Sequence, residues 1–361
     1  MNKIALTLTA ALMAFVSTHV QAKHKGFVIS SDDGNYTMKL GGRMQVRYTY
    51  DAVDGFGSSD NAADESAFNI PRARLKLAGH LFDKKMTYYF QTDFGKGKAG
   101  LKDFFTDYIV HNKWLRIRTG QSKRPFSRQQ LTSSGKQELV DRAITDKAFM
   151  AGRDIGIEIH NHYIKSPEFE YALGIYNGNG IKSDGFADRF NPTMVARLGY
   201  NYGGIKGYCE ADFNGGPFRF AMATSALMNF DIDGDDTNDT ALMGEIDFIM
   251  KIHGVTTSGA FYYSQANGES MLDGKTLSDA IGFHGQLGYL IFGKYQPVLR
   301  YAMVQYSETK TTQSEISAGI SFYPHKHNFK WQSDVAMKST LVDGSNTQDD
   351  YVIRTQLQVA F

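Results

Sequence analysis

The feature that most constrains the fold is an alternation of apolar and charged residues that repeats along most of the chain. From residue 38 to residue 50 the even positions are apolar, aromatic or glycine: Met38, Leu40, Gly42, Met44, Val46, Tyr48 and Tyr50. The odd positions up to residue 49 are polar, charged or glycine: Lys39, Gly41, Arg43, Gln45, Arg47 and Thr49. Successive side chains of a strand point to opposite faces, so this period of two predicts a β-strand with one apolar and one charged face.

The same alternation recurs along the chain and predicts sixteen strands. They are residues 36–50, 68–82, 85–94, 102–111, 114–121, 154–162, 168–177, 191–202, 217–228, 240–251, 254–265, 279–291, 295–307, 313–323, 328–339 and 350–361. A further segment, residues 205–213, is interpreted as part of a turn.

The lengths of these segments and of their connections favour a barrel that spans a membrane. Many segments exceed the usual five to six residues of a globular strand and match the roughly nine to eleven that a tilted strand needs to cross a bilayer. Short connections, such as residues 82–85 and 251–254, alternate with longer polar ones, such as residues 229–239. This predicts an all-β, 16-stranded antiparallel transmembrane barrel, because only a closed sheet pairs every backbone amide in lipid. The alternative is a soluble sandwich whose charged faces point to water.

Charge and composition exclude several other classes of protein. The chain has 39 Lys and Arg against 38 Asp and Glu, and its first 22 residues hold one Lys and no acid. The remainder therefore has no net charge, which argues against a nucleic-acid binder. A single cysteine, Cys209, excludes an intrachain disulfide and a site with several cysteine ligands.

The N-terminus has the pattern of a secretory signal. A short basic start is followed by an apolar run over residues 4–16 and by small residues at Val20 and Ala22. We expect residues 1–22 to be a signal peptide and residues 23–361 to form the barrel. The alternative is a buried N-terminal helix. Export of a chain without cysteine pairs favours the bacterial cell envelope.

One long insertion interrupts the alternation after the fifth predicted strand. Residues 122–153 contain seven cations, namely Lys123, Arg124, Arg128, Lys136, Arg142, Lys147 and Arg153, against the three acids Glu138, Asp141 and Asp146. A loop of this length in a compact domain usually has a function. Its place after the fifth strand resembles that of a loop that folds inward in sixteen-stranded outer-membrane barrels, and this resemblance implies a constriction loop here.

Four stretches resemble the phosphate-selective porin O and P family. They are residues 68–77 (FNIPRARLKL), 79–83 (GHLFD), 120–134 (GQSKRPFSRQQLTSS) and 152–156 (GRDIG), and the similarity is specific over about residues 36–162. Ser122 stands where the family usually has an aromatic residue. The resemblance implies a homotrimer of sixteen-stranded barrels in the outer membrane that carries phosphate or other small anions. It also implies that Lys123 is the lysine of the constriction and that Ser127, Ser133 and Ser134 are hydroxyl donors beside it.

The charged faces of the early strands favour anions independently of this resemblance. When they are assigned to the lumen, they place a row of cations there: Lys39, Arg43, Arg47, Arg72, Arg74, Lys76, Arg116 and Arg118. Guanidinium groups bind phosphate oxygens in a bidentate manner, and rings of Arg and Lys are the usual source of anion selectivity. With Lys123, Arg124 and Arg128 of the insertion, these cations form the predicted anion passage.

Three other functions stay open at this point. The cations could pair with loop carboxylates and only stiffen the wall, as in a general diffusion porin. The barrel could be a receptor or adhesin, or a membrane enzyme with a dispersed triad, although no Gly-x-Ser-x-Gly motif occurs. Asp231–Asp236 resembles the start of a calcium loop, but position twelve is Leu242 instead of Glu. His160 and His162 could bind a metal with His325 or His327. We predict no catalytic residue, metal or cofactor, and expect outer-membrane lipid as the surroundings.

Overall fold

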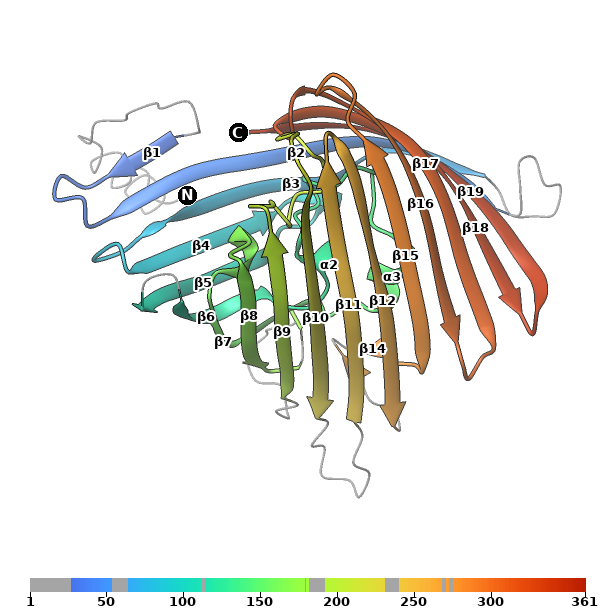
Figure 1. Cartoon of the computed structure of the whole chain (residues 1–361), viewed down its shortest axis with the longest axis horizontal. Helices are drawn as coiled ribbons and strands as arrows, with labels where there is room; N and C mark the ends of the chain where they lie inside the picture. The colour runs from blue at the N-terminus through green and yellow to red at the C-terminus, as the bar shows by residue number, and fades with distance from the viewer. Residues whose placement is uncertain are drawn as a thin grey trace, which may run out of the picture.

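The strands of the chain close into one barrel (Figure 1). The computed structural model describes residues 27–53, 64–111, 114–178, 180–181, 192–230, 240–267, 271–272 and 275–361. Within them, sixteen antiparallel strands pair in sequence, and the last pairs with the first in a register that joins Tyr351 to Ala52 and Ala360 to Arg43. No helix among these residues is long and apolar enough to cross a bilayer.

All sixteen predicted strands are confirmed, with ends that differ by a few residues. The barrel strands are β2 Thr37–Ala52, β3 Glu65–His80, β4 Met86–Asp93, β5 Gly100–His111, β6 Leu115–Lys123, β7 Arg153–His160, β8 Phe169–Tyr176, β9 Thr193–Tyr202, β10 Arg219–Phe230, β11 Thr240–Ile252, β12 Val255–Asn267, β15 Ala280–Tyr289, β16 Tyr295–Tyr306, β17 Thr311–His325, β18 Phe329–Val342 and β19 Ser345–Ala360. The predicted signal peptide and the calcium-like stretch at residues 231–236 lie outside the described residues.

The structure adds elements that the alternation did not predict. A short strand, β1 Phe27–Ser30, pairs with the beginning of β2, and β13 Met271–Leu272 pairs with β14 Lys275–Thr276. The strand β19 begins at Ser345 because Asp343 and Gly344 form a tight turn with φ values of 50° and 80°. An Asp-Gly pair is well suited to such a hairpin turn, so the predicted loop before residue 350 is instead continuous strand.

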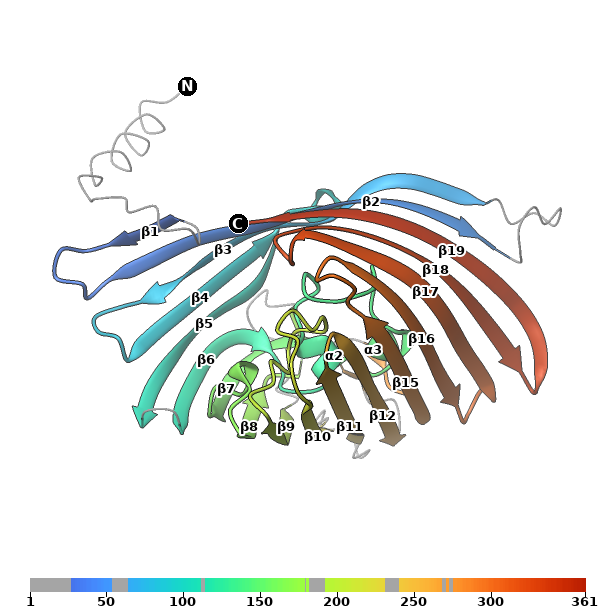
Figure 2. The same ribbon diagram turned by 45° about the horizontal axis from the view of Figure 1, so that its top comes forward.

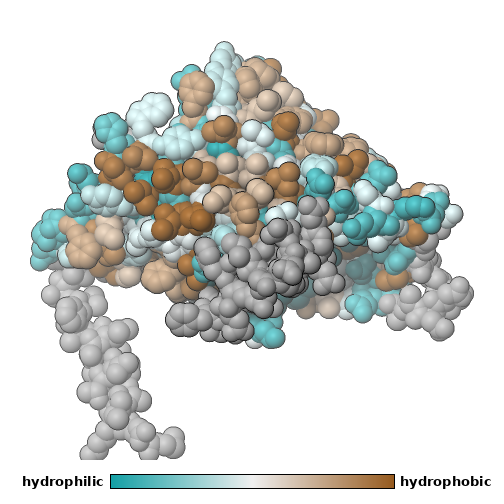
Figure 3. All heavy atoms as spheres, turned by 90° about the horizontal axis from the view of Figure 1, so that it is seen from below, coloured by the Kyte–Doolittle hydropathy of each residue, from teal (hydrophilic) through white to brown (hydrophobic). Residues whose placement is uncertain are grey.

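The barrel has its polar side chains inside and its apolar side chains outside. Along β15, Ile281, Phe283 and Leu287 are exposed, whereas His284 and Gln286 are buried in the lumen. Figure 3 shows apolar residues gathered across one face of the barrel, with hydrophilic residues towards its sides. This reverses the arrangement of a soluble sandwich and fits a sheet whose outer face contacts lipid.

Two connections fold into the barrel from opposite ends. The connection between β6 and β7, here called the inner loop (residues 124–152), contains α2 Arg128–Leu131 and α3 Ile144–Ala148. Figure 2 shows both helices inside the ring of strands. The predicted inward fold of this loop is therefore confirmed. The connection between β9 and β10, here called the inner turn (residues 203–218), enters from the end that carries the short turns. It includes residues 205–213, which are a turn as predicted.

A cation on the outer face should oppose insertion of the barrel into lipid. Leu299, near the middle of β16, is 61% exposed on that face. We expect Leu299→Arg to destabilise the folded barrel by about 2–4 kcal/mol, the cost of Arg near the bilayer midplane. Denaturant titration of barrels refolded into lipid vesicles measures this change. The control Thr309→Arg adds the same charge at an exposed position between β16 and β17 and should leave stability unchanged. Equal stability of the two variants would contradict a lipid-facing β16.

Candidate functional site

Ion pairs and ring contacts hold both ends of the inner loop against β11 and β12. The Arg128 Nε donates to Asp247 Oδ1 at 2.6 Å, and the Arg128 backbone N–H donates to Oδ2 of the same carboxylate at 3.0 Å. The Ser127 hydroxyl lies 2.9 Å from the Tyr262 hydroxyl, and the Phe149 ring stacks on Tyr262 with 5.1 Å between centroids. These contacts are buried, so they fix where the loop crosses the lumen.

The middle of the loop is held by side chains of the late strands. Its backbone carbonyls accept hydrogen bonds from Lys330 Nζ at Gln137 (2.7 Å) and from Gln332 Nε2 at Glu138 (2.8 Å). The loop therefore lies against the wall of the late strands, because that wall supplies donors for backbone that would otherwise be buried without partners.

A cavity of about 640 Å³, here called the larger cavity, remains between the inner loop and β3–β7. Its lining is strongly basic. The cations are Arg74, Lys76, Arg116, Arg118, Lys123, Lys136, Arg153 and Lys165, and the acids are Asp103 and Asp107. Six of the residues predicted for the anion passage are in this lining: Arg74, Lys76, Arg116, Arg118, Lys123 and Ser133.

The lining cations differ in how far their charge is already paired. Arg118 donates to both Asp107 and Glu158, Arg74 pairs with Asp93 at 2.8 Å, and Arg153 pairs with Asp103 at 2.9 Å. Within the described part of the chain, five lining cations have no acid within 4.0 Å: Lys76, Arg116, Lys123, Lys136 and Lys165. Of these, Lys123 donates to backbone carbonyls. The Arg116 Nε is buried and has no hydrogen-bond partner there. Such donors are available to a mobile anion.

The structure also brings Ser133 together with two further residues that were predicted for the passage, Arg43 and Ser134. Arg43 donates to the hydroxyl of Ser133 at 3.1 Å and to that of Ser134 at 2.8 Å. A Cβ at position 135 would lie 2.1 Å from Arg43 Nη1, so any residue larger than glycine there would displace this guanidinium. Since hydroxyl groups carry no charge, this contact leaves the charge of Arg43 uncompensated by a direct acidic partner.

Other predicted residues are placed away from an open passage. Arg124 is fully buried against Asp154 (2.5 Å), and Ser127 and Arg128 are buried anchors of the inner loop. Their placement differs from the prediction because each has a partner in the wall.

Arg47 donates to both oxygens of Asp141, and Arg72 lies 3.7 Å from the same carboxylate, so a loop acid offsets their charge. Lys123 lines the larger cavity, but its ammonium donates to the carbonyls of Gln130 and Leu131. Lys39 is exposed and lines neither of the two cavities described here.

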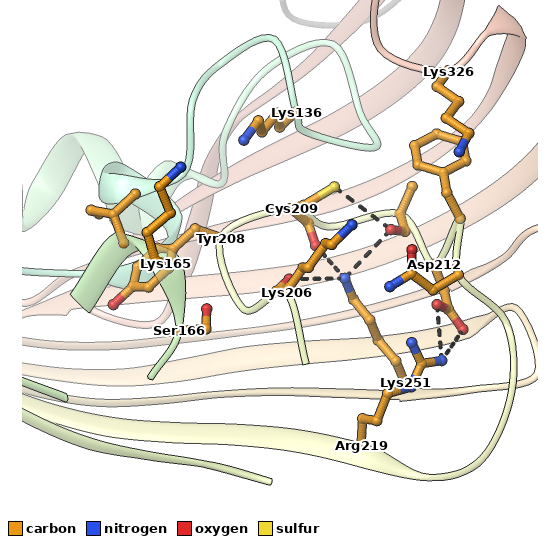
Figure 4. Close-up of a pocket in the computed structure, with 14 residues that line it drawn as sticks. Lys136, Lys165, Ser166, Lys206, Tyr208, Cys209, Asp212, Arg219, Lys251 and Lys326 are labelled. Carbon is orange, nitrogen blue, oxygen red and sulfur yellow. Dashed lines mark hydrogen bonds and ion pairs between the residues drawn. The ribbon is translucent and has the colours of Figure 1, made fainter. Parts of the chain in front are cut away.

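A second cavity of about 420 Å³, the smaller cavity, lies beside the inner turn (Figure 4). Its cations are Lys136, Lys165, Lys206, Arg219, Lys251 and Lys326, and its acid is Asp212. Lys251 donates to the carbonyls of Lys206, Cys209 and Ala211, and Arg219 forms a bidentate pair with Asp212, so these contacts fold the turn inward.

Sequence reasoning missed most of this second group. Lys165 and Lys206 belong to turns with no alternation, and the predicted row of cations was taken from the early strands alone. No excess of charge in the sequence marked these turns, because residues 161–168 hold one lysine and one acid, and residues 203–218 hold one lysine and two acids. Among the described residues, no group of three His, Cys, Asp or Glu side chains is close enough to hold a metal. His160 contacts Asp107 at 3.0 Å, and His327 contacts Cys209 Sγ at 3.3 Å.

Two carboxylates meet where the inner loop contacts the inner turn. Gln286 Nε2 donates to Glu138 Oε2 at 2.8 Å and to Glu210 Oε2 at 3.2 Å, so one amide bridges both acids. Burial and the neighbouring Glu210 carboxylate raise the pKa of Glu138 to about 8, although Lys251 of β11 opposes the shift. Glu138 therefore holds a proton at neutral pH and lets the two side chains lie side by side.

The stability of the folded barrel should fall as this proton is lost. The pKa of Glu138 is raised in the folded protein from its usual value of 4.5, so proton binding favours the folded state. That stability is fully present below about pH 4.5 and is lost as the pH rises through about 8. Thermal unfolding followed by tryptophan fluorescence should show this slope. We expect Glu138→Gln to flatten it, while the exposed control Glu308→Gln keeps it. A slope equal in wild type and Glu138→Gln would contradict the raised pKa of Glu138.

Removing the first anchor should release the inner loop. Arg128→Ala removes one of two guanidinium partners of the buried Asp247 carboxylate, and Arg197 Nη2 remains 2.8 Å from it. The loss should therefore be smaller than about 3–5 kcal/mol, the cost of fully breaking a buried pair. We expect lower stability in denaturant and a larger, noisier current through single barrels in planar bilayers. The control Lys147→Ala removes an exposed cation of the same loop and should behave as wild type. An unchanged current for Arg128→Ala would show that this pair does not hold the loop.

Known proteins with this fold are porins. The solved structures that resemble the chain include an anion-selective porin from Comamonas acidovorans, with a TM-score of 0.64 and 12% identity over 90% of this chain and 100% of that one. They also include the outer membrane channel DcaP of Acinetobacter baumannii, with a TM-score of 0.63 and 14% identity over 93% and 99% of the two chains. At such low identity these likenesses show the fold alone.

Sequence comparison gives the family. An uncharacterized protein of Aquifex aeolicus is 24% identical over 378 aligned residues, covering 90% of this chain and 87% of that protein. The family model described as phosphate-selective porin O and P matches residues 38–361, which include every barrel strand except the first residue of β2. The chain therefore belongs to the phosphate-selective porin O and P family and is a porin of the bacterial outer membrane.

Proposed function

We propose that this porin is a passive channel selective for anions, with a preference for phosphate. The observation that carries the proposal is the lining of the larger cavity, where eight cations face two acids. The barrel as a whole has no net charge, but this cavity, through which a solute would pass, has an excess of cations. The Comamonas acidovorans porin of the same fold is named as anion-selective, which agrees with the proposal.

The geometry supports stepwise passage of an anion over several weak sites. Arg116 and Lys76 supply donors without acidic partners, and Arg43 is held only by hydroxyl groups. Guanidinium groups are weakly hydrated and fit phosphate oxygens, so they can replace part of the hydration shell of the ion. Conduction needs binding that is favourable but spread over several sites, because a single deep site would trap the ion. The paired Arg74, Arg118 and Arg153 add positive potential but hold it against the wall.

The mature protein and its assembly belong to the same proposal. We expect residues 1–22 to be removed on export and residues 23–361 to assemble as a homotrimer in outer-membrane lipid. A porin with a similar fold, OmpT of Vibrio cholerae, is known in a trimer form. The transport step makes and breaks no bond, so the proposal assigns no catalytic residue and no cofactor.

A general diffusion porin is the second candidate, and a specific observation favours it. Asp141 lies within 4.0 Å of Arg47, Arg72 and Arg354, so part of the predicted row of arginines is neutralised by the inner loop. In a general diffusion porin, the remaining cations would offset the negative charge of the acids in the wall and would not select between anions and cations. The two functions differ in ion preference, which electrical recording measures.

Recording from purified barrels in planar bilayers tests the proposal. In a gradient of potassium chloride we expect a reversal potential of the sign for chloride over potassium, and in chloride we expect added phosphate to reduce the current. Lys76→Gln and Arg116→Gln remove lining charges that have no acidic partner, so both should weaken the block by phosphate. The exposed control Lys96→Gln lies outside the larger cavity and should keep it. Cation preference, or a chloride current that phosphate leaves unchanged, would favour the general porin.

A further inference from the structure

One lysine of the inner loop lies between the two basic cavities. The larger and smaller cavities share three lining residues, Lys136, Ile164 and Lys165. Lys136 is exposed, although the four residues on its C-terminal side are all buried. Its ammonium has no hydrogen bond or ion pair with the described part of the chain, whereas that of Lys123 is occupied by two backbone carbonyls. Figure 4 shows the Lys136 side chain extending into the smaller cavity on the side of Lys165.

The backbone that carries this lysine is held on every side. The Lys136 N–H donates to the Ser133 carbonyl at 2.7 Å, and Gly135 packs against the Arg43 guanidinium. From the inner turn, the Glu210 N–H donates to the Lys136 carbonyl at 3.1 Å, and the Glu138 N–H donates to the Glu210 carboxylate at 2.8 Å. Glu210 is therefore hydrogen-bonded to the inner loop at Lys136 and at Glu138. A fixed backbone with one free charged side chain is the arrangement expected of a group that meets the solute.

We propose that Lys136 determines which ions pass between the two cavities and that Glu210 is the positioning residue that keeps it there. This inference rests on the proposed function of an anion channel and assigns its selectivity to a residue outside the predicted set. An anion that leaves the arginine-lined wall of the larger cavity meets an ammonium with three free donors before it reaches the lysines beside the inner turn. Because Lys165 lies across the same junction, the pair repels a cation from both sides.

The inner turn has a function in this arrangement. It lines the smaller cavity with Lys206, and through Glu210 it fixes the height at which the inner loop crosses the lumen. The salt bridge between Arg219 and Asp212 and the capped ammonium of Lys251 hold the turn itself. Selectivity at the junction therefore depends on contacts that enter the barrel from both ends.

The test compares Lys136→Gln with Lys147→Gln, which removes an exposed lysine of the same loop that lines neither cavity. Both positions are exposed, so both variants should fold. With chloride as the current carrier and inorganic phosphate as the blocking probe, we expect Lys136→Gln to weaken the block by up to about fivefold, the upper end for one exposed charge contact, and to lower the preference for chloride over potassium. Lys147→Gln should change neither quantity.

The possible outcomes separate the two proposals. If wild type prefers cations or ignores phosphate, the proposed function fails. If wild type selects anions while Lys136→Gln and Lys147→Gln behave alike, the function stands and the assignment of Lys136 is wrong.

The role of Glu210 is tested by a pair of variants. Glu210→Gln keeps an oxygen that can accept from the Glu138 N–H, whereas Glu210→Ala removes it. We expect Glu210→Ala to weaken phosphate block as Lys136→Gln does, and Glu210→Gln to restore it to within about twofold of wild type. In Lys136→Gln, adding Glu210→Ala should weaken the block no further. If Glu210→Ala leaves the block unchanged, or if the two changes add in full, Glu210 does not act through Lys136.

Discussion

The structure depends on the closure of the sheet, in which β19 pairs with β2. A backbone amide in hydrocarbon has no water to bond, so every strand needs a neighbour on each side and the sheet can have no free edge. Closure also divides the side chains into two sets. The alternate residues that point outward must suit lipid, and all the charge of the strands must enter the lumen. The lumen therefore holds many polar and charged side chains. The inner loop and the inner turn supply hydrogen-bond and ion-pair partners for many of them.

The position of the passage follows from which charges are paired. The late strands present donors such as Lys330 and Gln332, and the carbonyls of the inner loop accept from them. The loop is thereby drawn to that side and leaves the basic wall of β3–β7 facing open space. The same loop neutralises some cations of β2 and β3, as Asp141 does for Arg47 and Arg72, and leaves others such as Arg116 without an acid. Selectivity is thus a property of the residual, unpaired charge. A count of all arginines in the strands overestimates the selectivity for anions, because it includes arginines that are already paired with acids.

The strands could be predicted from the sequence because alternate side chains of a barrel strand face lipid and the lumen, so apolar and polar residues alternate with a period of two. The inward path of the inner loop was expected from its place after the fifth strand, where sixteen-stranded porins have a similar loop, whereas its length alone indicated only that it has a function. The partners of individual cations could not be predicted, because Arg128 and Asp247 are far apart in the chain and meet only through the seating of the loop. The same limit applies to Arg124, which looked equivalent to Lys123 in the sequence but is buried against Asp154. Lys136 was visible as one charge among seven. Glu210 holds the backbone on both sides of Gln137 and so positions Lys136. Glu210 belongs to a turn without alternation, so the sequence pattern did not reveal this contact.

The central claim is that unpaired cations line a water-filled passage beside the inner loop, and bound anions would locate that passage directly. Crystals of the folded barrel soaked in bromide, examined at the bromine absorption edge, would give anomalous peaks wherever bromide rests. The account predicts peaks within contact distance of Lys76, Arg116 and Lys136, on the side of the lumen formed by β3–β7. Peaks confined to the exposed loops, with none in that cavity, would contradict it.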